Sequence, residues 1–214
     1  QQYATDPWYV HLYRNSYAYH GVHPFYMWYW GAYAMDYLGD VIFVGADRRT
    51  VARMGYRTAT SFADALEMAK RYFENAAPMI DSALRTADMQ AKEDASHVVW
   101  RRDRAFTLHQ AVERAYACFL LVHTFYFPRS HNIKFLRSLA EDVDKRLIEA
   151  WPREQRLDKR RFETLKRAYV EARYSDQYDI SVEDLDALAD CARRLRDLVV
   201  QACEARIAAM GDGV

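Results

Sequence analysis

Cysteine is scarce in this sequence. Only three cysteines occur among 214 residues, and no two of them form a Cys-x-x-Cys pair. Structural zinc sites built from cysteine use such closely spaced ligands, so a zinc site is not expected. Cys118, Cys191 and Cys203 occupy apolar positions of expected helices, which favours buried, reduced thiols. We therefore expect neither a metal nor another cofactor.

The sequence also lacks an excess of one charge and a long hydrophobic run. Lys and Arg total 30, and Asp and Glu also total 30, so the formal net charge is zero. A field around the whole molecule that attracts nucleic acid is excluded, and such binding needs a local basic patch. The longest apolar run, residues 24–35, is too short to span a bilayer before Asp36 interrupts it. No signal-peptide pattern opens the sequence, so we expect a cytoplasmic protein without a membrane partner.

Hydrophobic residues, by contrast, are abundant. They make up 51% of the chain, which is enough for a sizeable core. Aromatic residues crowd the first third, whereas basic residues become abundant after Lys70. This change of composition predicts two units, residues 1–67 and residues 68–214. Residues 41–45 and 57–60 of the first unit have the pattern of short strands, which indicates a small aromatic-rich α/β unit.

The second unit has the pattern of helices. Apolar residues recur at helical spacing from Phe62 onward. Pro78 is expected to open a helix, where its missing N–H is not needed, and Pro128 is expected to end a long central helix. Ser61 and Ser181 are each followed three residues later by an aspartate, the spacing of a capping box. The expected fold class is mainly α: a bundle of about five helices with the small α/β unit before it.

Three blocks of the second unit carry a resemblance to a known family: residues 106–116, 130–140 and 166–175. In order and spacing they resemble the HEPN domains that accompany minimal nucleotidyltransferases, and the resemblance covers residues 69–210. It implies a HEPN-like helical bundle that forms homodimers and binds RNA or nucleotides. Many members of the family also cleave RNA without a metal, and the resemblance implies this activity as a candidate for this chain. A nucleotidyltransferase-type partner protein is a further implication.

The nucleases of this family carry an arginine followed, four to six residues later, by a histidine on a late helix. The matching stretch here is residues 172–181, ARYSDQYDIS, in which Arg173 is present but Gln177 and Tyr178 stand where the histidine belongs. Histidine is a common base because it titrates near neutral pH, whereas tyrosine, with a pKa of about 10, is a poor one. Arg173 and Tyr178 are the catalytic candidates, and Tyr174 is a candidate for stacking on a base. Alternatively, Arg173 bonds helix-end carbonyls and the tyrosines pack.

A second group of candidates for nucleotide or RNA binding lies on the expected central helix. Arg104 and His109 have the Arg-x4-His spacing, but residues five apart on a helix point away from one another. Glu113 lies four residues beyond His109. Either these side chains face a groove that binds a nucleotide, or His109, Gln110 and Glu113 form an internal polar network.

A third group lies at the start of the next expected helix. His131, Lys134 and Arg137 surround a helix N-terminus, which favours an anion, and Ser130 is expected to cap it. This indicates either a phosphate site or simple capping. The basic residues of segment 153–167 are interleaved with acidic ones, which is typical of a solvated helix face or, alternatively, of a patch along RNA.

The first unit does not have the pattern of a nucleotidyltransferase, because the Gly-Ser and the spaced aspartates of such enzymes are missing. Four blocks, residues 21–31, 40–45, 52–56 and 63–69, instead resemble the C-terminal part of lactate-racemase-like proteins. The histidines and lysine that such enzymes use for their nickel cofactor are not among them. The resemblance therefore predicts a scaffold or a partner surface.

Three functions are left open by the sequence. The first is a dimeric HEPN protein that binds nucleotides or RNA and has weak or absent nuclease activity, because Arg173 has no matching histidine. The second is a metal-independent RNase toxin of a toxin–antitoxin pair, in which Tyr178 or His109 replaces the usual base. The third is a non-catalytic interaction module that docks a partner protein through its aromatic unit.

Overall fold

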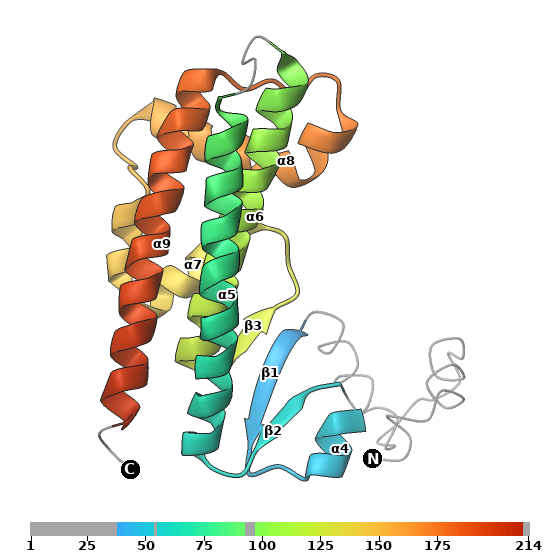
Figure 1. Cartoon of the computed structure of the whole chain (residues 1–214), viewed down its shortest axis with the longest axis vertical. Helices are drawn as coiled ribbons and strands as arrows, with labels where there is room; N and C mark the ends of the chain where they lie inside the picture. The colour runs from blue at the N-terminus through green and yellow to red at the C-terminus, as the bar shows by residue number, and fades with distance from the viewer. Residues whose placement is uncertain (1–37, 54, 93–96, 212–214) are drawn as a thin grey trace, which may run out of the picture.

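A computed structural model describes residues 38–53, 55–92 and 97–211 of the chain (Figure 1). The elements, in chain order, are β1 (Leu38–Val44), α4 (Arg48–Arg53), β2 (Arg57–Ala59), α5 (Phe62–Gln90), α6 (Val98–Thr124), β3 (Tyr126–Pro128), α7 (Ile133–Val143), the 3₁₀ helix η1 (Lys145–Ala150), α8 (Arg156–Tyr174) and α9 (Val182–Gly211). The prediction of a mainly α protein with a small α/β unit is confirmed. The aromatic-rich segment before residue 38, with the block at residues 21–31, lies outside the described residues, and its resemblance stays a prediction.

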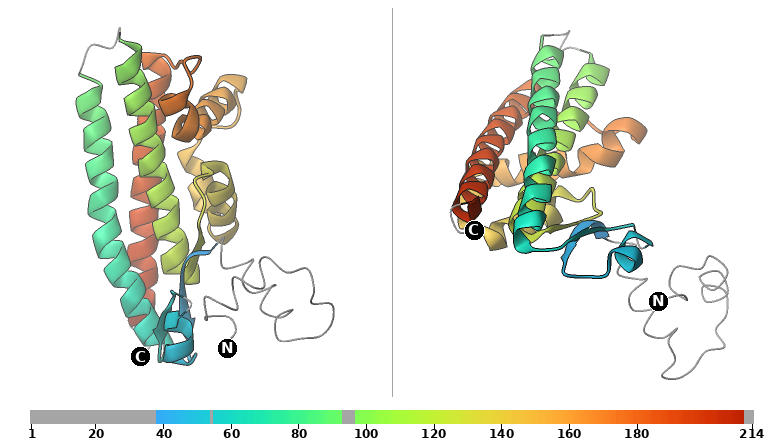
Figure 2. Two further views of the ribbon diagram at one scale, coloured as in Figure 1. Left: turned by 90° about the vertical axis from the view of Figure 1, so that its right-hand side faces the viewer. Right: turned by 60° about the horizontal axis from the view of Figure 1, so that its bottom comes forward.

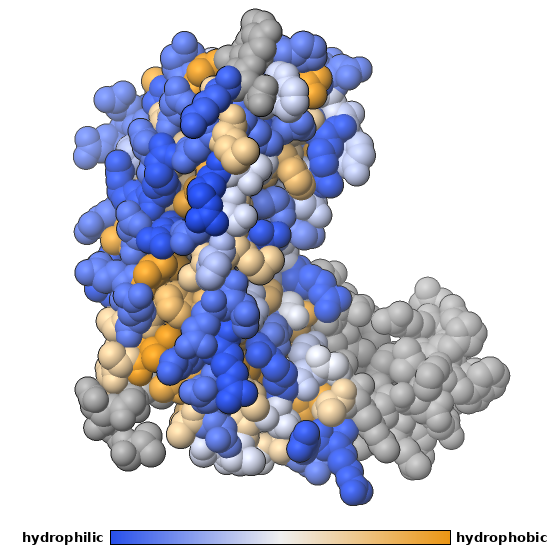
Figure 3. Space-filling model, in the orientation of Figure 1, coloured by the Kyte–Doolittle hydropathy of each residue, from blue (hydrophilic) through white to orange (hydrophobic). Residues whose placement is uncertain are grey.

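Helix α6 is the centre of the bundle. It packs against α5 and α9 on one side and against α7 and α8 on the other, as Figures 1 and 2 show. Every side chain from residue 115 to residue 122 is buried. A helix that is apolar all round must be covered on all sides, which explains its central position. The face shown in Figure 3 is mostly hydrophilic, and its apolar side chains gather in a narrow strip over the lower halves of α5 and α9.

The small sheet ties the first unit to the bundle. Its strand order is β2-β1-β3, with β2 parallel and β3 antiparallel to β1. Strand β3 follows α6 directly, so it belongs to the second unit in sequence but pairs with the first in space. A Cβ at Gly39 would lie 2.6 Å from the Phe127 ring, so glycine permits this close approach. The predicted boundary between residues 67 and 68 falls inside α5, which begins at Phe62.

Two predicted helix boundaries are wrong. Pro78 does not open a helix but lies inside α5, and the hydrogen bond that it cannot donate is offset by a buried stripe that includes Ala69, Ile80 and Leu84. Helix α6 ends at Thr124, four residues before Pro128. Its C-cap residue Phe125 has a left-handed φ of 58°, and the Phe125 N–H donates to the Leu121 carbonyl at 2.9 Å. The chain then enters β3, a strand that helical periodicity does not reveal.

The predicted caps are confirmed at two of three helices. The hydroxyls of Ser61 and Ser181 each accept a hydrogen bond of 3.1 Å from the N–H of the aspartate three residues later. Helix α7, in contrast, is capped by Asn132, whose side-chain oxygen accepts hydrogen bonds from the N–H groups of Lys134 and Phe135. The predicted cap, Ser130, accepts a hydrogen bond from the N–H of Asn132 and so orders the preceding loop. No helix in the described ranges combines the length and the apolar character needed to cross a membrane.

Candidate functional site

Arg173 lies in the last turn of α8 with its side chain exposed. Its guanidinium carbon is 4.5 Å from the ring centre of Phe106, 4.7 Å from that of Tyr169 and 5.1 Å from that of Tyr174. Nε and Nη2 donate to the main-chain carbonyl of Tyr169 at 3.0 and 2.7 Å. Within the described part of the chain, Nη1 has no hydrogen-bond partner. The guanidinium is therefore fixed by rings and one carbonyl, and it keeps a donor for a ligand.

His131 reaches this place from the loop before α7. Its ring lies 4.0 Å from that of Tyr169 at an interplanar angle of 14°, a stacked geometry. Nδ1 is 3.0 and 3.1 Å from the two carboxylate oxygens of Glu113 on α6. The side chain is 53% exposed, whereas that of Glu113 is 19% exposed. Since Glu113 engages Nδ1, Nε2 is the ring nitrogen that can meet a ligand.

His109 lies beneath these groups and is fully buried. Its ring centre is 5.5 Å from that of Tyr169, and Nδ1 is 3.7 Å from a Glu113 oxygen. Neither ring nitrogen has a hydrogen-bond partner of ordinary length among the described residues, so the expected internal network is not formed there. Burial lowers the pKa of His109 to about 4; the charges of His131 and Arg173 act in the same direction, and the main chain of His131 opposes them. The imidazole is therefore neutral at pH 7.

The lowered pKa of His109 predicts a loss of stability in mild acid. The unfolded chain takes up a proton at His109 near pH 6.5, and the folded chain takes one up only near pH 4. The free energy of unfolding therefore has its full value above about pH 6.5 and falls as the pH drops below it. Between about pH 7.5 and about pH 5 the loss amounts to about 2 kcal/mol. Urea denaturation of the native chain and of His109→Gln checks this, because the variant should lose most of that pH dependence. His97→Gln, at an exposed position, is the control; an unchanged slope in His109→Gln contradicts the prediction.

We call these residues the Arg173 cluster: Phe106, His109, Glu113, His131, Tyr169 and Arg173. Arg104 is not part of it, although the sequence made it a binding candidate. Its side chain is buried, and Nη1 binds the Asp186 carboxylate of α9 at 2.7 Å. Residues 104 and 109 diverge around α6, as the helical spacing predicts.

The two tyrosines of the stretch at residues 172–181 have opposite environments. Tyr174 is 76% exposed beside Arg173. Tyr178 is 2% exposed, and its hydroxyl donates to the Thr164 carbonyl at 3.2 Å. Burial raises the pKa of Tyr178 above its ordinary value, so the phenol stays protonated. In this packing Tyr178 anchors the turn after α8, and Tyr174 is the tyrosine that a ligand can reach.

The helical bundle matches a known family of domains. A family model of the HEPN domain matches residues 62–203, well over half of the chain. The chain belongs to the HEPN family. No curated protein matches the chain closely enough to count as a relative. The match begins at the first residue of α5, and it includes every member of the Arg173 cluster.

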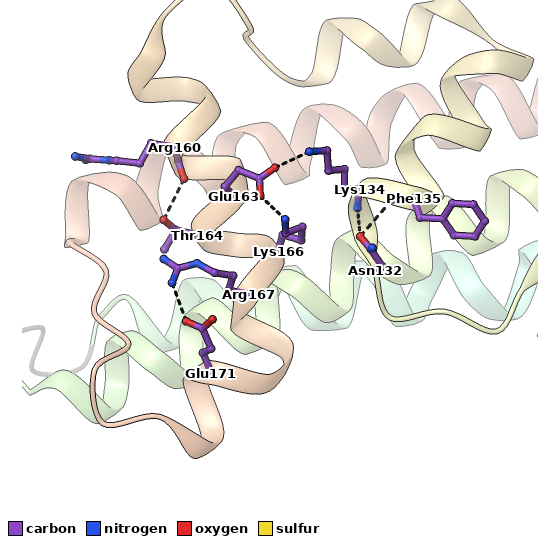
Figure 4. Close-up of polar contacts among 9 residues, drawn as sticks. All are labelled: Asn132, Lys134, Phe135, Arg160, Glu163, Thr164, Lys166, Arg167 and Glu171. Carbon is purple, nitrogen blue, oxygen red and sulfur yellow. Dashed lines mark hydrogen bonds and ion pairs between the residues drawn. The ribbon is translucent and has the colours of Figure 1, made fainter.

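The remaining two candidates, Lys134 and Arg137, lie farther along the HEPN domain in the groove between α7 and α8. Lys134 binds Glu163 of α8 at 3.1 Å, and Figure 4 shows this ion pair bridging the two helices. Arg137 donates to Glu141 at 2.7 Å, and its guanidinium carbon lies 4.5 Å from the ring centre of Phe162. Lys134 and Arg137 therefore belong to a second location, distinct from the Arg173 cluster.

Sequence reasoning missed Phe106 and Tyr169. A signal for both was present, because Phe106, His109 and Glu113 follow one face of α6 at intervals of three and four residues. Tyr169 and Arg173 are likewise four apart on α8. What the HEPN sequence did not reveal is that these two faces meet and that His131 stacks between them and the solvent.

Proposed function

We propose that this HEPN protein binds RNA or nucleotides through the Arg173 cluster. One observation carries the proposal: the exposed Arg173 guanidinium carbon lies 4.5 to 5.1 Å from three aromatic ring centres, and Nη1 has no hydrogen-bond partner among the described residues. A guanidinium clamps phosphate, and aromatic rings such as the exposed Tyr174 stack on bases. The chain has no net charge, so it does not attract a polyanion through its overall field. Binding of a polyanion therefore requires a local site such as this one.

We further propose that the protein acts as a homodimer with weak or absent nuclease activity. Val170 and Tyr174 are four residues apart on α8, and they are 55% and 76% exposed. A second copy that covers Val170 would bury apolar surface beside the Arg173 cluster and leave Tyr174 open to the ligand. Weak cleavage follows from Tyr178, which stands where the family's histidine belongs but has a buried phenol that supplies no base.

The test is the affinity of the purified chain for single-stranded RNA and mononucleotides, with Arg173 intact and replaced. Its mass in solution, from light scattering, reports on the dimer. A chain that binds neither RNA nor nucleotides rules out this function and leaves the non-catalytic interaction module, which predicts a stable complex with a partner protein instead.

A second candidate, the metal-independent RNase toxin, is favoured by the pair of His131 and Glu113. Glu113 orients the imidazole, as a carboxylate does in many acid–base sites, and Arg173 stands nearby for the phosphate. Nε2 of His131 would take the proton of a ribose 2′-hydroxyl. The 2′-oxygen would attack the adjacent phosphorus and the P–O5′ bond would break, and the leaving 5′-oxygen would take a proton from water. The products would be a 2′,3′-cyclic phosphate and a 5′-hydroxyl. A nucleotidyltransferase-type partner would then be the antitoxin.

This candidate predicts that any RNA cleavage depends on His131 and not on Tyr178. His131→Asn should lower the cleavage rate by about a hundredfold or more, because a positioned base contributes that much. Glu113→Gln should lower it less, and EDTA should have no effect. Gel analysis of labelled RNA measures the rate, and His97→Asn is the control. Cleavage that survives His131→Asn but is lost in Tyr178→Phe would contradict the assignment.

A further inference from the structure

A pocket of about 350 Å³ opens between α7 and α8. This volume lies in the range of small-molecule sites. One face of α7, with Arg137 and Ser138, forms one wall, and α8, with Lys159 and Phe162, forms the other. The pocket and the Arg173 cluster lie at different points along α8. Glu163, which lines the pocket, and Arg173 are ten residues apart, or about 15 Å along the helix axis.

Arg137 is the most buried cation of the pocket lining. Its side chain is only 11% exposed. Nε is held by Glu141 at 2.7 Å, and the guanidinium carbon lies 4.5 Å from the ring centre of Phe162 and 5.7 Å from that of Trp151. No hydrogen bond of Nη1 or Nη2 is found with the residues that the structure describes. The pocket therefore contains a guanidinium that is oriented by a carboxylate and two rings and retains its outer donors, the geometry of an anion receptor.

The acidic residue closest to Arg137 does not cancel this positive charge. Glu141 accepts hydrogen bonds from both Arg137 and Arg153, so two cations share one carboxylate. Lys159 adds a further cation to the lining. An anion that enters the pocket therefore meets more positive than negative charge in this part.

The other two carboxylates of the lining are likewise matched by cations. Glu163 binds Lys134 at 3.1 Å and also Lys166, as Figure 4 shows, and these two lysines lower the pKa of Glu163. Asp158 lies 3.7 Å from Arg161. Each of the three carboxylates thus lies within 4 Å of a cation, although Arg161 binds Asp184 more closely, at 2.7 Å. The outer donors of Arg137 are left for a ligand.

We propose that the pocket between α7 and α8 binds a phosphomonoester: the phosphate of a mononucleotide or the 5′-phosphate at the end of an RNA strand. A phosphomonoester carries nearly two negative charges at pH 7 and accepts paired hydrogen bonds from a guanidinium. At the Arg173 cluster, His131 of the loop that leads into α7 stacks on Tyr169 of α8. A strand bound there can therefore direct its end along the groove. Only this RNA source depends on the proposed function; the mononucleotide source does not.

Titration calorimetry with adenosine 5′-monophosphate and with adenosine tests the chemistry of the pocket. The monophosphate should bind, and adenosine should bind at least about tenfold more weakly. Ser138→Phe fills the pocket from an exposed position of its wall without changing any charge, and should lower the affinity for the monophosphate by at least about tenfold. Ser82→Phe, at an exposed position of α5, is the matched control and should bind as the native chain does.

A second variant, Arg137→Lys, keeps the proposal testable if Ser138→Phe fails to fold. Arg137→Lys keeps the charge but removes the paired donors, and it should lower the affinity for the monophosphate while the thermal unfolding curve shows a folded protein. Failure of the native chain to bind the monophosphate overturns the proposal. Native-like binding by both Ser138→Phe and Arg137→Lys overturns it as well.

Two RNA oligonucleotides that differ only in a 5′-phosphate or a 5′-hydroxyl identify the source. If the ligand is an RNA end, the phosphorylated strand binds about tenfold more tightly, and Ser138→Phe abolishes this difference. If the monophosphate binds but the two strands bind equally, the ligand is a free mononucleotide. Arg173→Gln separates the two proposals: it should weaken RNA binding and leave the Ser138-dependent binding of the monophosphate intact. If the native chain binds RNA but shows no Ser138-dependent binding of the monophosphate, only the pocket proposal is refuted.

Discussion

Replacing Arg173 by glutamine is expected to weaken the binding of single-stranded RNA by about tenfold to a hundredfold. The variant loses a charge-assisted contact with phosphate, and such contacts contribute about 1.5 to 3 kcal/mol. Folding should be unaffected, because the side chain is exposed and its hydrogen bonds go only to a carbonyl of its own helix. Fluorescence anisotropy at one fixed salt concentration measures the change, since affinity for a polyanion depends on salt.

The matched control is Arg167→Gln. Arg167 is exposed on the same helix and pairs with Glu171 at 2.8 Å, so its replacement makes the same change of net charge away from the aromatic rings. Arg173→Lys should retain only part of the affinity, because lysine keeps the charge but loses the planar donors that stack on Phe106 and Tyr169. Equal losses in Arg167→Gln and Arg173→Gln would mean that charge alone governs binding, and the cluster would have no special role.

Replacing Tyr178 by alanine is expected to reduce the free energy of unfolding by about 3 to 5 kcal/mol. The side chain is 2% exposed, and removal of a large buried aromatic ring leaves a cavity that costs about this much. Tyr178→Phe keeps the ring but removes the hydroxyl that donates to the Thr164 carbonyl, so it should cost only about 1 kcal/mol. Urea denaturation measures both values.

Tyr174→Ala is the control for Tyr178. Tyr174 is 76% exposed, so its loss should change the stability by less than about 0.5 kcal/mol, whereas RNA affinity should fall because a stacking ring is lost. Replacing Tyr178 should therefore change stability, and replacing Tyr174 should change RNA affinity. A Tyr178→Phe protein that is as stable as the native chain but has lost RNA binding would show that Tyr178 serves the ligand and not the fold.

The sequence predicted the features that depend on neighbouring residues. The caps at Ser61 and Ser181 need only an aspartate three positions later, and the helices need only apolar residues at intervals of three and four. The resemblance to the HEPN family, and Arg173 with it, also came from local blocks. The continuous α5 through Pro78 did not, because proline lacks one backbone donor and only the packing of the whole helix offsets that loss.

By itself, then, the sequence determined a mainly α HEPN protein with a late arginine and no histidine in the family's position. Only the tertiary structure decided which side chains surround that arginine. Phe106, His131 and Tyr169 come from three separate segments, and their contacts depend on how α6, α7 and α8 pack around one core. The same packing buried Tyr178 and Arg104, which the sequence had offered as functional residues. Helical spacing fixes the side of a helix on which a residue lies, whereas the partner of that side is fixed by the whole fold.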